Sequence, residues 1–391
     1  MRQFLEGSQA IAKIVSLCRP GVISAYPITP QTHIVEGLAK YVADGKLKSE
    51  FVNVESEHSA ASVVLGGSAG GARVFTATSS QGLFLMAEVV FNIAGMRLPV
   101  VMLVANRAIS APINIWNDHQ DSVSLRDSGW IQMYAENIQE AVDATLFAYK
   151  IAENKDIMLP VMVCMDGFIL THGLEPVDMP QEQDVKKFLP DYKAILKLDV
   201  DNPISMGLLA DPDYYLETRY AIQKTHDDIL ELIPKLSEEF EGVFGRKGIG
   251  LVEEYYTKDA DKVIVAMGSV TGTIKEAVDI MRAKKKKVGL LKINTYRPFP
   301  YKEVYRVLSK AKSVAVLDKA VSLGAYGPLY ADIASAFTGK SKLPKISGFI
   351  AGLGGRDIML DTIYGIFKKL NGTVKPCEYV DIKQELLRDH L

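Results

Sequence analysis

Short apolar runs alternate with helix-like segments along the first half of the chain. Apolar or β-branched runs of strand length occupy residues 22–26, 73–78, 99–105 and 160–164. Helical patterns lie between them, at residues 32–43, 58–67, 83–94 and 138–153. Short, fully apolar strands separated by helices are typical of a parallel sheet that is covered on both faces. Residues 1–175 are therefore predicted to form one open α/β domain.

The pattern changes after residue 175 and then returns. Prolines at 176, 180 and 190 precede polar stretches, and apolar residues recur at helical spacing over residues 213–242. Strand-like runs then reappear at residues 262–267, 288–293, 313–317 and 345–350. We expect residues 176–255 to be a connector with one long helix that packs on the first domain. Residues 256–391 are predicted to form a second open, parallel-sheet α/β domain.

Composition and charge exclude several classes of protein. The 391 residues are 48% hydrophobic and 24% charged, which permits a large core, and the formal net charge is -2. The one dense basic block, residues 284–287, is predicted to be a solvated turn between a helix and a strand rather than a nucleic-acid patch. No apolar run reaches the roughly 18 residues that span a bilayer, and the N-terminus lacks a signal-peptide pattern. We therefore expect neither nucleic acid nor membrane as a partner.

The cysteines are few and far apart. They are Cys18, Cys164 and Cys377, and no CxxC occurs. The sequence thus predicts no Fe–S cluster or metal site held by this chain alone, and no disulfide framework. A reducing, cytoplasmic location fits this usage best.

Polar residues follow the predicted strands, where ligands bind in open parallel sheets. The first such stretch is YPITP at residues 26–30, in which two prolines restrict the backbone of Thr29. A hydroxyl held in this way suits a fixed hydrogen bond to an anionic oxygen. The alternative is a plain strand-ending turn in which Pro30 opens the next helix.

A second candidate is Glu57, within VESEHSA at residues 54–60. A strand is predicted to end there and a helix of small residues to begin. A carboxylate at this position caps a helix without any cofactor. The functional alternative is a carboxylate directed into a site, where it donates or accepts one proton. Its neighbour Glu55 is interpreted as a solvated charge.

A third candidate, Arg107, follows the apolar strand at residues 99–105. A guanidinium there suits a carboxylate, which it can bind with two hydrogen bonds. The long apolar loop after it carries Trp116 and is positioned to wall a pocket. His119 in this loop is as consistent with a structural role as with a catalytic one. No serine or cysteine motif accompanies it, so a nucleophilic triad is rejected.

Two further turns leave their alternatives open. TATSSQGL at residues 76–83 is a small polar turn that enters a helix, where it either binds an anion or packs closely. GLGGRD at residues 352–357 does not have the GxGxxG spacing of a dinucleotide fingerprint. We favour tight packing or a subunit contact for it.

Taken together, these stretches resemble a known family over essentially the whole chain and in order. The matching blocks are YPITP, VESEHSA, FTATSSQGL at 75–83, RAISAPINIWNDHQDS at 107–122, RDSGWIQMYAEN at 126–137, MDGFILTH at 165–172, MGSVTGT at 267–273, YRPFP at 296–300 and GLGGRD. The chain resembles the alpha subunit of the multi-subunit pyruvate:ferredoxin oxidoreductases, or pyruvate synthases.

The resemblance implies a fold and a set of roles. The first domain would be like the pyrimidine-binding domain of thiamine-diphosphate enzymes, and the second like the C-terminal domain of transketolase. Glu57 matches the carboxylate that hydrogen-bonds the cofactor's pyrimidine ring, with Pro27 and Ile28 beside it. Thr29 and Arg107 match the residues that hold the substrate carboxylate, and Ile115 lies in the same substrate loop. The implied reaction is CoA-dependent oxidative decarboxylation of pyruvate to acetyl-CoA and CO2 with reduction of ferredoxin, or the reverse.

The family's metal motif is missing from this sequence. Thiamine-diphosphate enzymes hold the diphosphate through a divalent metal with a Gly-Asp-Gly motif, which does not occur here. The resemblance therefore implies that a beta subunit supplies Mg²⁺ and the diphosphate contacts. It also implies that [4Fe-4S] clusters lie in partner subunits, and that gamma and delta subunits complete the complex.

Two alternatives stay open at this point. The substrate loop at residues 110–118 favours pyruvate over 2-oxoisovalerate, although an apolar pocket discriminates by only about 1–3 kcal/mol per methylene. The alternative of another class is a Rossmann-like nucleotide-binding or scaffold protein. The absence of a GxGxxG fingerprint argues against it.

Overall fold

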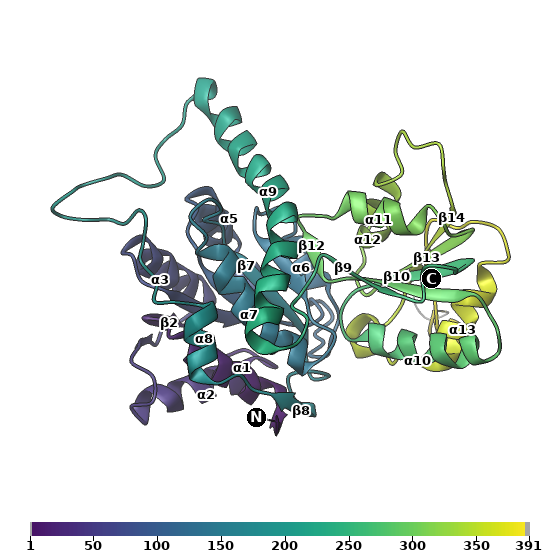
Figure 1. Ribbon diagram of the computed structural model, residues 1–391, viewed down its shortest axis with the longest axis horizontal. Helices are drawn as coiled ribbons and strands as arrows, with labels where there is room; N and C mark the ends of the chain where they lie inside the picture. The colour runs from purple at the N-terminus through teal and green to yellow at the C-terminus, as the bar shows by residue number, and fades with distance from the viewer. Residues whose placement is uncertain (1, 388–391) are drawn as a thin grey trace. The chain divides into compact units, whose positions relative to one another are not determined.

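The structure, a computed structural model, describes residues 2–387, which form two compact units (Figure 1). Within that range, unit 1 comprises the residues up to Leu251 together with Asn294–Pro300. Unit 2 comprises Val252–Ile293 and the residues from Tyr301 onward. Each unit is built on an open sheet in which most neighbouring strands are parallel. The predicted α/β fold class with two open parallel sheets is thereby confirmed.

The sheet of unit 1 has seven strands in the order β12-β6-β7-β5-β4-β2-β3. Their bounds are β2 (Val22–Ser24), β3 (Glu50–Val52), β4 (Val74–Thr78), β5 (Val101–Asn106), β6 (Ile131–Tyr134), β7 (Val161–Asp166) and β12 (Thr295–Arg297). All neighbours are parallel except β12, which runs antiparallel to β6. The central strands β4, β5 and β7 are buried along their whole length, as continuous apolar runs in a covered sheet require.

Helices cover this sheet and carry the residues that follow its strands. They are α1 (Gly7–Cys18), α2 (Thr32–Ala43), α3 (Glu57–Ala69), α4 (Ser80–Leu85), α5 (Ala87–Gly95), α6 (Gln120–Ser124) and α7 (Ile138–Ala152). The helix expected over residues 83–94 is interrupted at Met86, so that α4 and α5 are separate. The strand expected over residues 22–26 ends at Ser24, which leaves Tyr26 to Pro30 as a turn.

The segment from residue 174 to Leu251 is part of unit 1. It contains β8 (Leu174–Asp178), which pairs antiparallel with β1 (Arg2–Glu6), and the helices α8 (Glu182–Phe188) and α9 (Pro212–Phe244). Asp211 caps α9 by accepting a hydrogen bond from the Asp213 N–H, and Pro212 opens the helix. The loop before α9 extends past the edge of the sheet (Figure 1), and its Leu198 N–H donates to the Ala69 carbonyl at the end of α3 at 2.8 Å.

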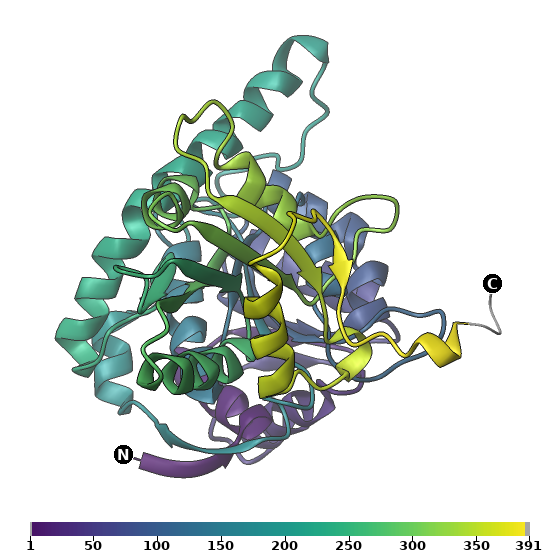
Figure 2. The same cartoon turned by 90° about the vertical axis from the view of Figure 1, so that its right-hand side faces the viewer.

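The sheet of unit 2 has six strands in the order β15-β14-β13-β10-β11-β9. They are β9 (Val252–Tyr255), β10 (Lys262–Ala266), β11 (Val288–Ile293), β13 (Ser313–Asp318), β14 (Lys345–Ile350) and β15 (Glu378–Tyr379). Its helices are α10 (Val270–Ala283), α11 (Tyr301–Leu308), α12 (Pro328–Ser335) and α13 (Leu360–Lys369), with two 3₁₀ turns at Leu353–Gly355 and Gln384–Leu386. Figure 2 shows α10 and α13 side by side along one face of this sheet, where their apolar residues form a buried cluster.

The compact units differ from the expected domain boundaries in two places. Unit 2 begins with β9, at Val252, because β9 pairs with β11. Residues 294–300, expected within the second domain, belong to unit 1 because β12 pairs with β6. A short strand whose partner, β6, lies about 160 residues earlier leaves no local signal in the sequence.

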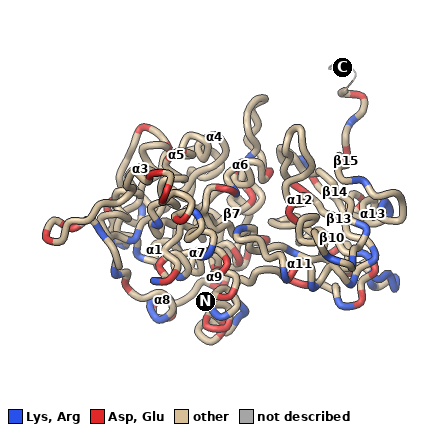
Figure 3. Tube along the Cα trace, turned by 90° about the horizontal axis from the view of Figure 1, so that it is seen from above, with Lys and Arg blue, Asp and Glu red and all other residues tan. Residues whose placement is uncertain are grey.

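Charge and hydropathy match the sequence analysis where the structure describes them. Lys284 to Lys287 form an exposed turn between α10 and β11, which confirms the predicted solvated turn. Elsewhere acidic and basic residues are interspersed along the trace (Figure 3). Within residues 2–387, no helix combines the length and apolarity needed to cross a membrane.

Candidate active site

The predicted site residues of unit 1 gather at one edge of its sheet. The strands β3, β2, β4 and β5 are adjacent and parallel, so their carboxyl ends lie at the same edge. Glu57 follows β3, Thr29 follows β2, Gly82 follows β4 and Arg107 follows β5. Four chain segments that are far apart in sequence are thereby brought together where parallel sheets bind ligands.

Glu57 is the first residue of α3, and its side chain is buried with 7% exposed. The helix is capped by Ser56, whose hydroxyl accepts a hydrogen bond from the Ser59 N–H at 3.2 Å. Glu57 is therefore not needed as the cap. Its neighbour Glu55 is exposed and accepts a hydrogen bond from the Ser59 hydroxyl, as expected of the solvated carboxylate.

The Glu57 carboxylate lies against the start of α4. A Cβ added at Gly82 would be 2.6 Å from Glu57 Oε1 and 2.6 Å from Thr78 Oγ1, so only glycine fits there. Three buried polar atoms of this turn have no hydrogen-bond partner among the described residues: Thr78 Oγ1, Ser79 Oγ and Gln81 Nε2. Because buried polar groups are normally paired, this turn and the carboxylate together have the donors and acceptors of a ligand site.

Arg107 is buried at the end of β5 and ties two segments together. Its Nη1 donates to the backbone carbonyl of Thr29 at 2.9 Å, and its Nε donates to the carbonyl of Asn114 at 3.0 Å. Among the residues that the structure describes, its Nη2 has no partner. Burial lowers the pKa of the guanidinium, and the Asp121 carboxylate opposes that shift. Two nitrogens of the guanidinium therefore build the site, and the third, Nη2, can bind an anion.

Hydrogen bonds of Gln31 fix the turn that carries Thr29. Gln31 is fully buried, its Nε2 donates to the Ala77 carbonyl of β4 at 2.6 Å, and its backbone N–H donates to the Ile28 carbonyl at 2.8 Å. Thr29 and Pro27 are exposed, and Ile28 is half-buried. The link between Thr29 and Arg107 runs through the Thr29 backbone, which leaves the Thr29 hydroxyl available to a ligand.

Asp121 is the residue that sequence reasoning missed. It is fully buried and accepts hydrogen bonds from the backbone N–H groups of Ser80 and Arg107, both at 3.0 Å, and from Asn106 Nδ2 at 2.8 Å. Burial raises the pKa of its carboxyl to about 6, although these hydrogen bonds favour the charged form. In sequence it is one acid among several polar residues after the loop, and only its inward direction distinguishes it.

The loop between Arg107 and α6 is closed by a backbone hydrogen bond between two of its own residues, and part of it is exposed. The Ala108 N–H donates to the Trp116 carbonyl at 2.9 Å. Ile115 is half-buried, whereas 54% of Trp116 is exposed and its ring lies 6.5 Å from that of Phe168. His119 is buried and its Nε2 lies 2.7 Å from Asp166 Oδ1. This burial favours the structural alternative for His119.

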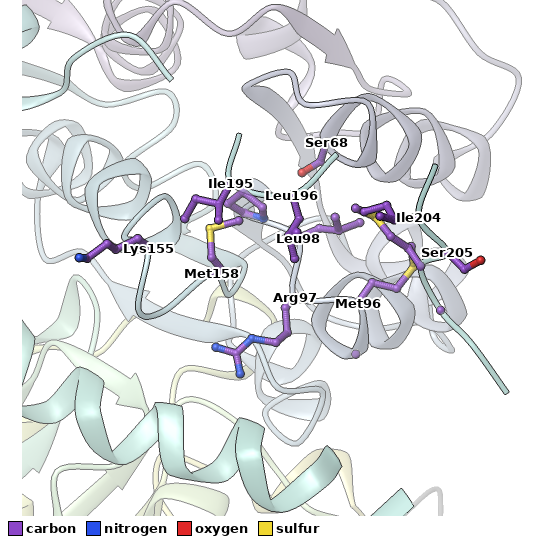
Figure 4. A pocket seen from close by; sticks show the side chains of 14 residues that line it. Ser68, Met96, Arg97, Leu98, Lys155, Met158, Ile195, Leu196, Ile204 and Ser205 are labelled. Atoms are coloured by element: carbon purple, nitrogen blue, oxygen red, sulfur yellow. The ribbon is translucent and has the colours of Figure 1, made fainter. Parts of the chain in front are cut away.

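A cavity of unit 1 lies away from these residues. It has a volume of about 490 Å³ and lies beside Leu98 and Pro99, which precede β5, and Met158, which precedes β7. Its place at the amino ends of these strands puts it at the edge opposite to Glu57 and Arg107. Figure 4 shows mainly apolar side chains around it, with the Lys155 amine directed away. This cavity is therefore separate from the predicted site.

In unit 2, the glycine-rich turn after β14 is tightly packed. A Cβ at Gly352 would lie 2.7 Å from Ile358 Cδ1, and Gly352, Gly354 and Gly355 all have positive φ. The Arg356 guanidinium donates to the Asp381 backbone carbonyl. These contacts support the packing interpretation of GLGGRD over a phosphate loop.

Two family models cover most of the chain. Residues 14–238 match the model described as "Pyruvate flavodoxin/ferredoxin oxidoreductase, thiamine diP-bdg". The chain belongs to this family. Residues 260–363 match "Pyruvate:ferredoxin oxidoreductase core domain II". The resemblance found in the sequence is confirmed, and so is the thiamine-diphosphate-binding type of the first domain.

Curated relatives match this family member over almost their full length. "Pyruvate synthase subunit PorA" of Methanothermobacter thermautotrophicus is 49% identical over 97% of this chain and 98% of its own. The protein of the same name from Methanocaldococcus jannaschii is 53% identical over 92% of each chain. "Ketoisovalerate oxidoreductase subunit VorA" of Pyrococcus horikoshii is 43% identical over 96% of this chain and 95% of its own.

Solved structures share the fold of this family member. The 2-oxoglutarate:ferredoxin oxidoreductase from Magnetococcus marinus superposes with a TM-score of 0.74 at 20% identity, over 95% of this chain. The chain spans only 65% of the length of that protein. A split gene transketolase superposes with a TM-score of 0.55 at 12% identity, over 93% of this chain and 96% of its own. At these identities the likeness concerns the fold alone.

Proposed function

We propose that this chain is the alpha-type subunit of a pyruvate:ferredoxin oxidoreductase complex. The complex converts pyruvate and CoA to acetyl-CoA and CO2 with reduction of ferredoxin, or runs the reverse synthesis of pyruvate. The names and near-complete coverage of the PorA relatives support this assignment. The structural observation that carries it is the buried Glu57 carboxylate against Gly82, at the same sheet edge as Arg107.

The residues at this edge fit the pyrimidine half of thiamine diphosphate. An aminopyrimidine presents ring nitrogens and an amino group, and Glu57 is placed to share a proton with a ring nitrogen. The unpartnered Thr78, Ser79 and Gln81 groups match the remaining polar edge, while Pro27 and Ile28 offer apolar contact. When bound, the cofactor supplies a nucleophilic carbon and an electron sink for decarboxylation. Glu57 acts by holding a proton at the pyrimidine in a water-poor environment.

Arg107 and Thr29 are proposed to bind the substrate carboxylate. Arg107 Nη2 remains available on a guanidinium whose Nε and Nη1 are each fixed by a backbone carbonyl. A cation that is already oriented loses little rotamer freedom when the anion arrives. The Thr29 hydroxyl adds a second donor, and Ile115 lies on the loop that offers apolar contact to the substrate methyl.

The rest of the active site is proposed to come from other subunits. No Gly-Asp-Gly motif occurs in the sequence, and the three cysteines are widely separated. We infer that a beta subunit supplies Mg²⁺ and the diphosphate contacts, and that [4Fe-4S] clusters lie in partner subunits, with gamma and delta subunits in the complex. The free thiols Cys18, Cys164 and Cys377 suit a reducing cytoplasm.

The branched-chain alternative is less favoured. The VorA relative is 43% identical to this chain, against 49% and 53% for two PorA relatives. All three cover the chain almost completely, so the difference does not arise from partial matches. A Rossmann-like nucleotide-binding or scaffold protein is not supported, because the chain belongs to a thiamine-diphosphate-binding family.

The test is reduction of a low-potential electron acceptor by the natively purified complex, dependent on pyruvate and on CoA. Pyruvate, 2-oxoisovalerate and 2-oxoglutarate are compared in parallel, in wild type and in Glu57→Gln and Glu55→Gln variants. We expect Glu57→Gln to lower the rate with pyruvate roughly 100-fold or more. The exposed Glu55→Gln serves as the matched control and is expected to retain activity.

Each outcome bears on a separate part of the proposal. A preference for 2-oxoisovalerate keeps the site roles and overturns the substrate. A Glu57→Gln complex as active as the control overturns the role of Glu57. Failure with every 2-oxoacid, in a complex that contains bound thiamine diphosphate and intact clusters, overturns the assignment.

A further inference from the structure

Two histidines and a glutamate meet beside the α2 helix, outside the residues assigned to the reaction. Glu6 ends β1, His33 lies in the first turn of α2, and His172 follows β7. His33 Nδ1 is 2.8 Å from Glu6 Oε1, and the rings of His33 and His172 have centroids 4.8 Å apart. One potential ligand atom from each of the three residues lies within 4.8 Å of the other two.

A hydrogen bond with Thr171 orients the ring of His172. Thr171 Oγ1 lies 2.7 Å from His172 Nδ1 and accepts a hydrogen bond from the Phe168 N–H at 2.8 Å. When Nδ1–H donates to this hydroxyl, the lone pair is on Nε2. Metal-binding histidines are typically fixed in this way, by a hydrogen bond from the ring nitrogen that does not bind the metal.

The cluster is also accessible. The side chain of His33 is 45% exposed and that of Glu6 is 26% exposed, while His172 is half-buried. An ion can enter from this side, and a water molecule can complete its coordination. Two imidazoles and one carboxylate form a donor set that suits Zn²⁺ and its neighbours rather than Mg²⁺ or Ca²⁺.

We propose that Glu6, His33 and His172 form a binding site for a divalent transition-metal ion of the Zn²⁺ type, with the fourth position open to water. Small side-chain rotations bring the three atoms to the spacing of a tetrahedral site, and the ion replaces the proton between His33 and Glu6.

The ion acts as a clamp within unit 1. It joins the start of α1, the start of α2 and the segment after β7. The first and last of these already meet through hydrogen bonds from Gly7 N–H to the Gly173 carbonyl and from Ser8 N–H to the Thr171 carbonyl. Because α2 begins just after the turn that carries Thr29, the clamp also steadies that turn. Metal binding to the folded chain therefore raises its thermal stability.

The experiment uses the full-length chain in a Cys377→Ser background, stripped of metal with a chelator. The background removes the half-buried thiol as a competing ligand, since Cys18 and Cys164 are buried. ZnCl2 is titrated by calorimetry, and CoCl2 by visible absorption, which reports the coordination number. The variants are Glu6→Gln, His33→Gln and His172→Gln, with His58→Gln as the control. His58 is an exposed histidine in the first turn of α3.

We expect one equivalent of Zn²⁺ per chain and a higher melting temperature with the metal. Each ligand variant should weaken binding about tenfold or more and abolish the gain in melting temperature, while His58→Gln should behave as wild type. Metal-free melting temperatures identify any variant that does not fold. Glu6→Gln keeps the size of the side chain and a hydrogen bond to His33. It therefore still tests the site if one of the histidine variants does not fold. Absence of binding by the wild type, or binding that the ligand variants leave unchanged, overturns the proposal.

Discussion

The carboxylate of Asp121 accepts a hydrogen bond from the backbone N–H of Arg107 at 3.0 Å, and the same oxygen accepts one from the Ser80 N–H. One buried oxygen thus joins the end of β5, which carries the guanidinium, to the start of α4, which contains Gly82. The two halves of the proposed site, for substrate and for cofactor, share this anchor. We therefore infer that Asp121 is a positioning residue, which acts through Arg107 and the start of α4.

We predict that Asp121→Asn raises the KM for pyruvate and lowers kcat, by about tenfold to 100-fold in kcat/KM. An amide has one acceptor oxygen, and its NH2 group would face a backbone N–H. Steady-state kinetics of the complex measure both parameters. Unchanged kinetics in a folded variant would show that the anchor is dispensable.

The raised pKa of Asp121 predicts a pH dependence. Its folded pKa of about 6 is above the ordinary carboxyl value of 3.8, so the folded chain holds this proton more tightly than the unfolded chain. The contribution of Asp121 to stability is therefore full below about pH 4 and declines as the pH rises to about 6. Activity should change in the opposite sense, because protonation below pH 6 replaces an acceptor by a donor. A fall in kcat/KM with an apparent pKa near 6, absent in Asp121→Asn, would confirm this.

Gly82→Ala should weaken thiamine diphosphate binding at least about tenfold while the chain still folds. The new methyl would lie 2.6 Å from both Glu57 Oε1 and Thr78 Oγ1, and must displace the carboxylate. Gly66→Ala is the matched control, because a Cβ at Gly66 of α3 meets nothing within 4 Å. Calorimetric titration of the cofactor-free complex compares the two. Equal affinities would contradict the predicted position of the pyrimidine.

Arg107→Lys should raise the KM for pyruvate about tenfold or more, despite the conserved charge. An ammonium cannot hold the Thr29 and Asn114 carbonyls and also present a free edge to the carboxylate. The measurement is KM and kcat for pyruvate, with the KM for CoA as an internal reference. An equal rise in both KM values would indicate general distortion instead of lost carboxylate binding.

Arg73→Ala should destabilise unit 1 by about 3–5 kcal/mol, because it leaves the carboxylate of Glu153 buried without its partner. Arg73 Nε lies 2.6 Å from Glu153 Oε1, and Nη1 donates to the Cys18 carbonyl at 2.6 Å. Urea unfolding measures the loss. The double variant Arg73→Met with Glu153→Met should recover much of it, and a double variant no better than the single would argue that the carbonyl contacts dominate.

Sequence analysis predicted those parts of the fold that have a local pattern in the sequence. The buried strands β4, β5 and β7 are continuous apolar runs. Thr29 and Arg107 became candidates because each follows an apolar run, and Glu57 because a strand was predicted to end and a helix to begin beside it. Asp121 was missed because its role depends on the direction and burial of its side chain. Neither can be predicted from an acidic residue at the start of a helix. Met86, where α4 and α5 separate, lies in an apolar stretch with no glycine or proline at the break.

Residues 294–300 belong to unit 1 although the residues on either side of them belong to unit 2. This connectivity determines where the chain can be cut into fragments. The backbone passes between the units three times, at 251/252, 293/294 and 300/301. A fragment that stops at Leu251 loses β12 and leaves β6 as an open edge strand, which is a template for aggregation. A single cut in the chain therefore cannot separate the two units and leave both intact.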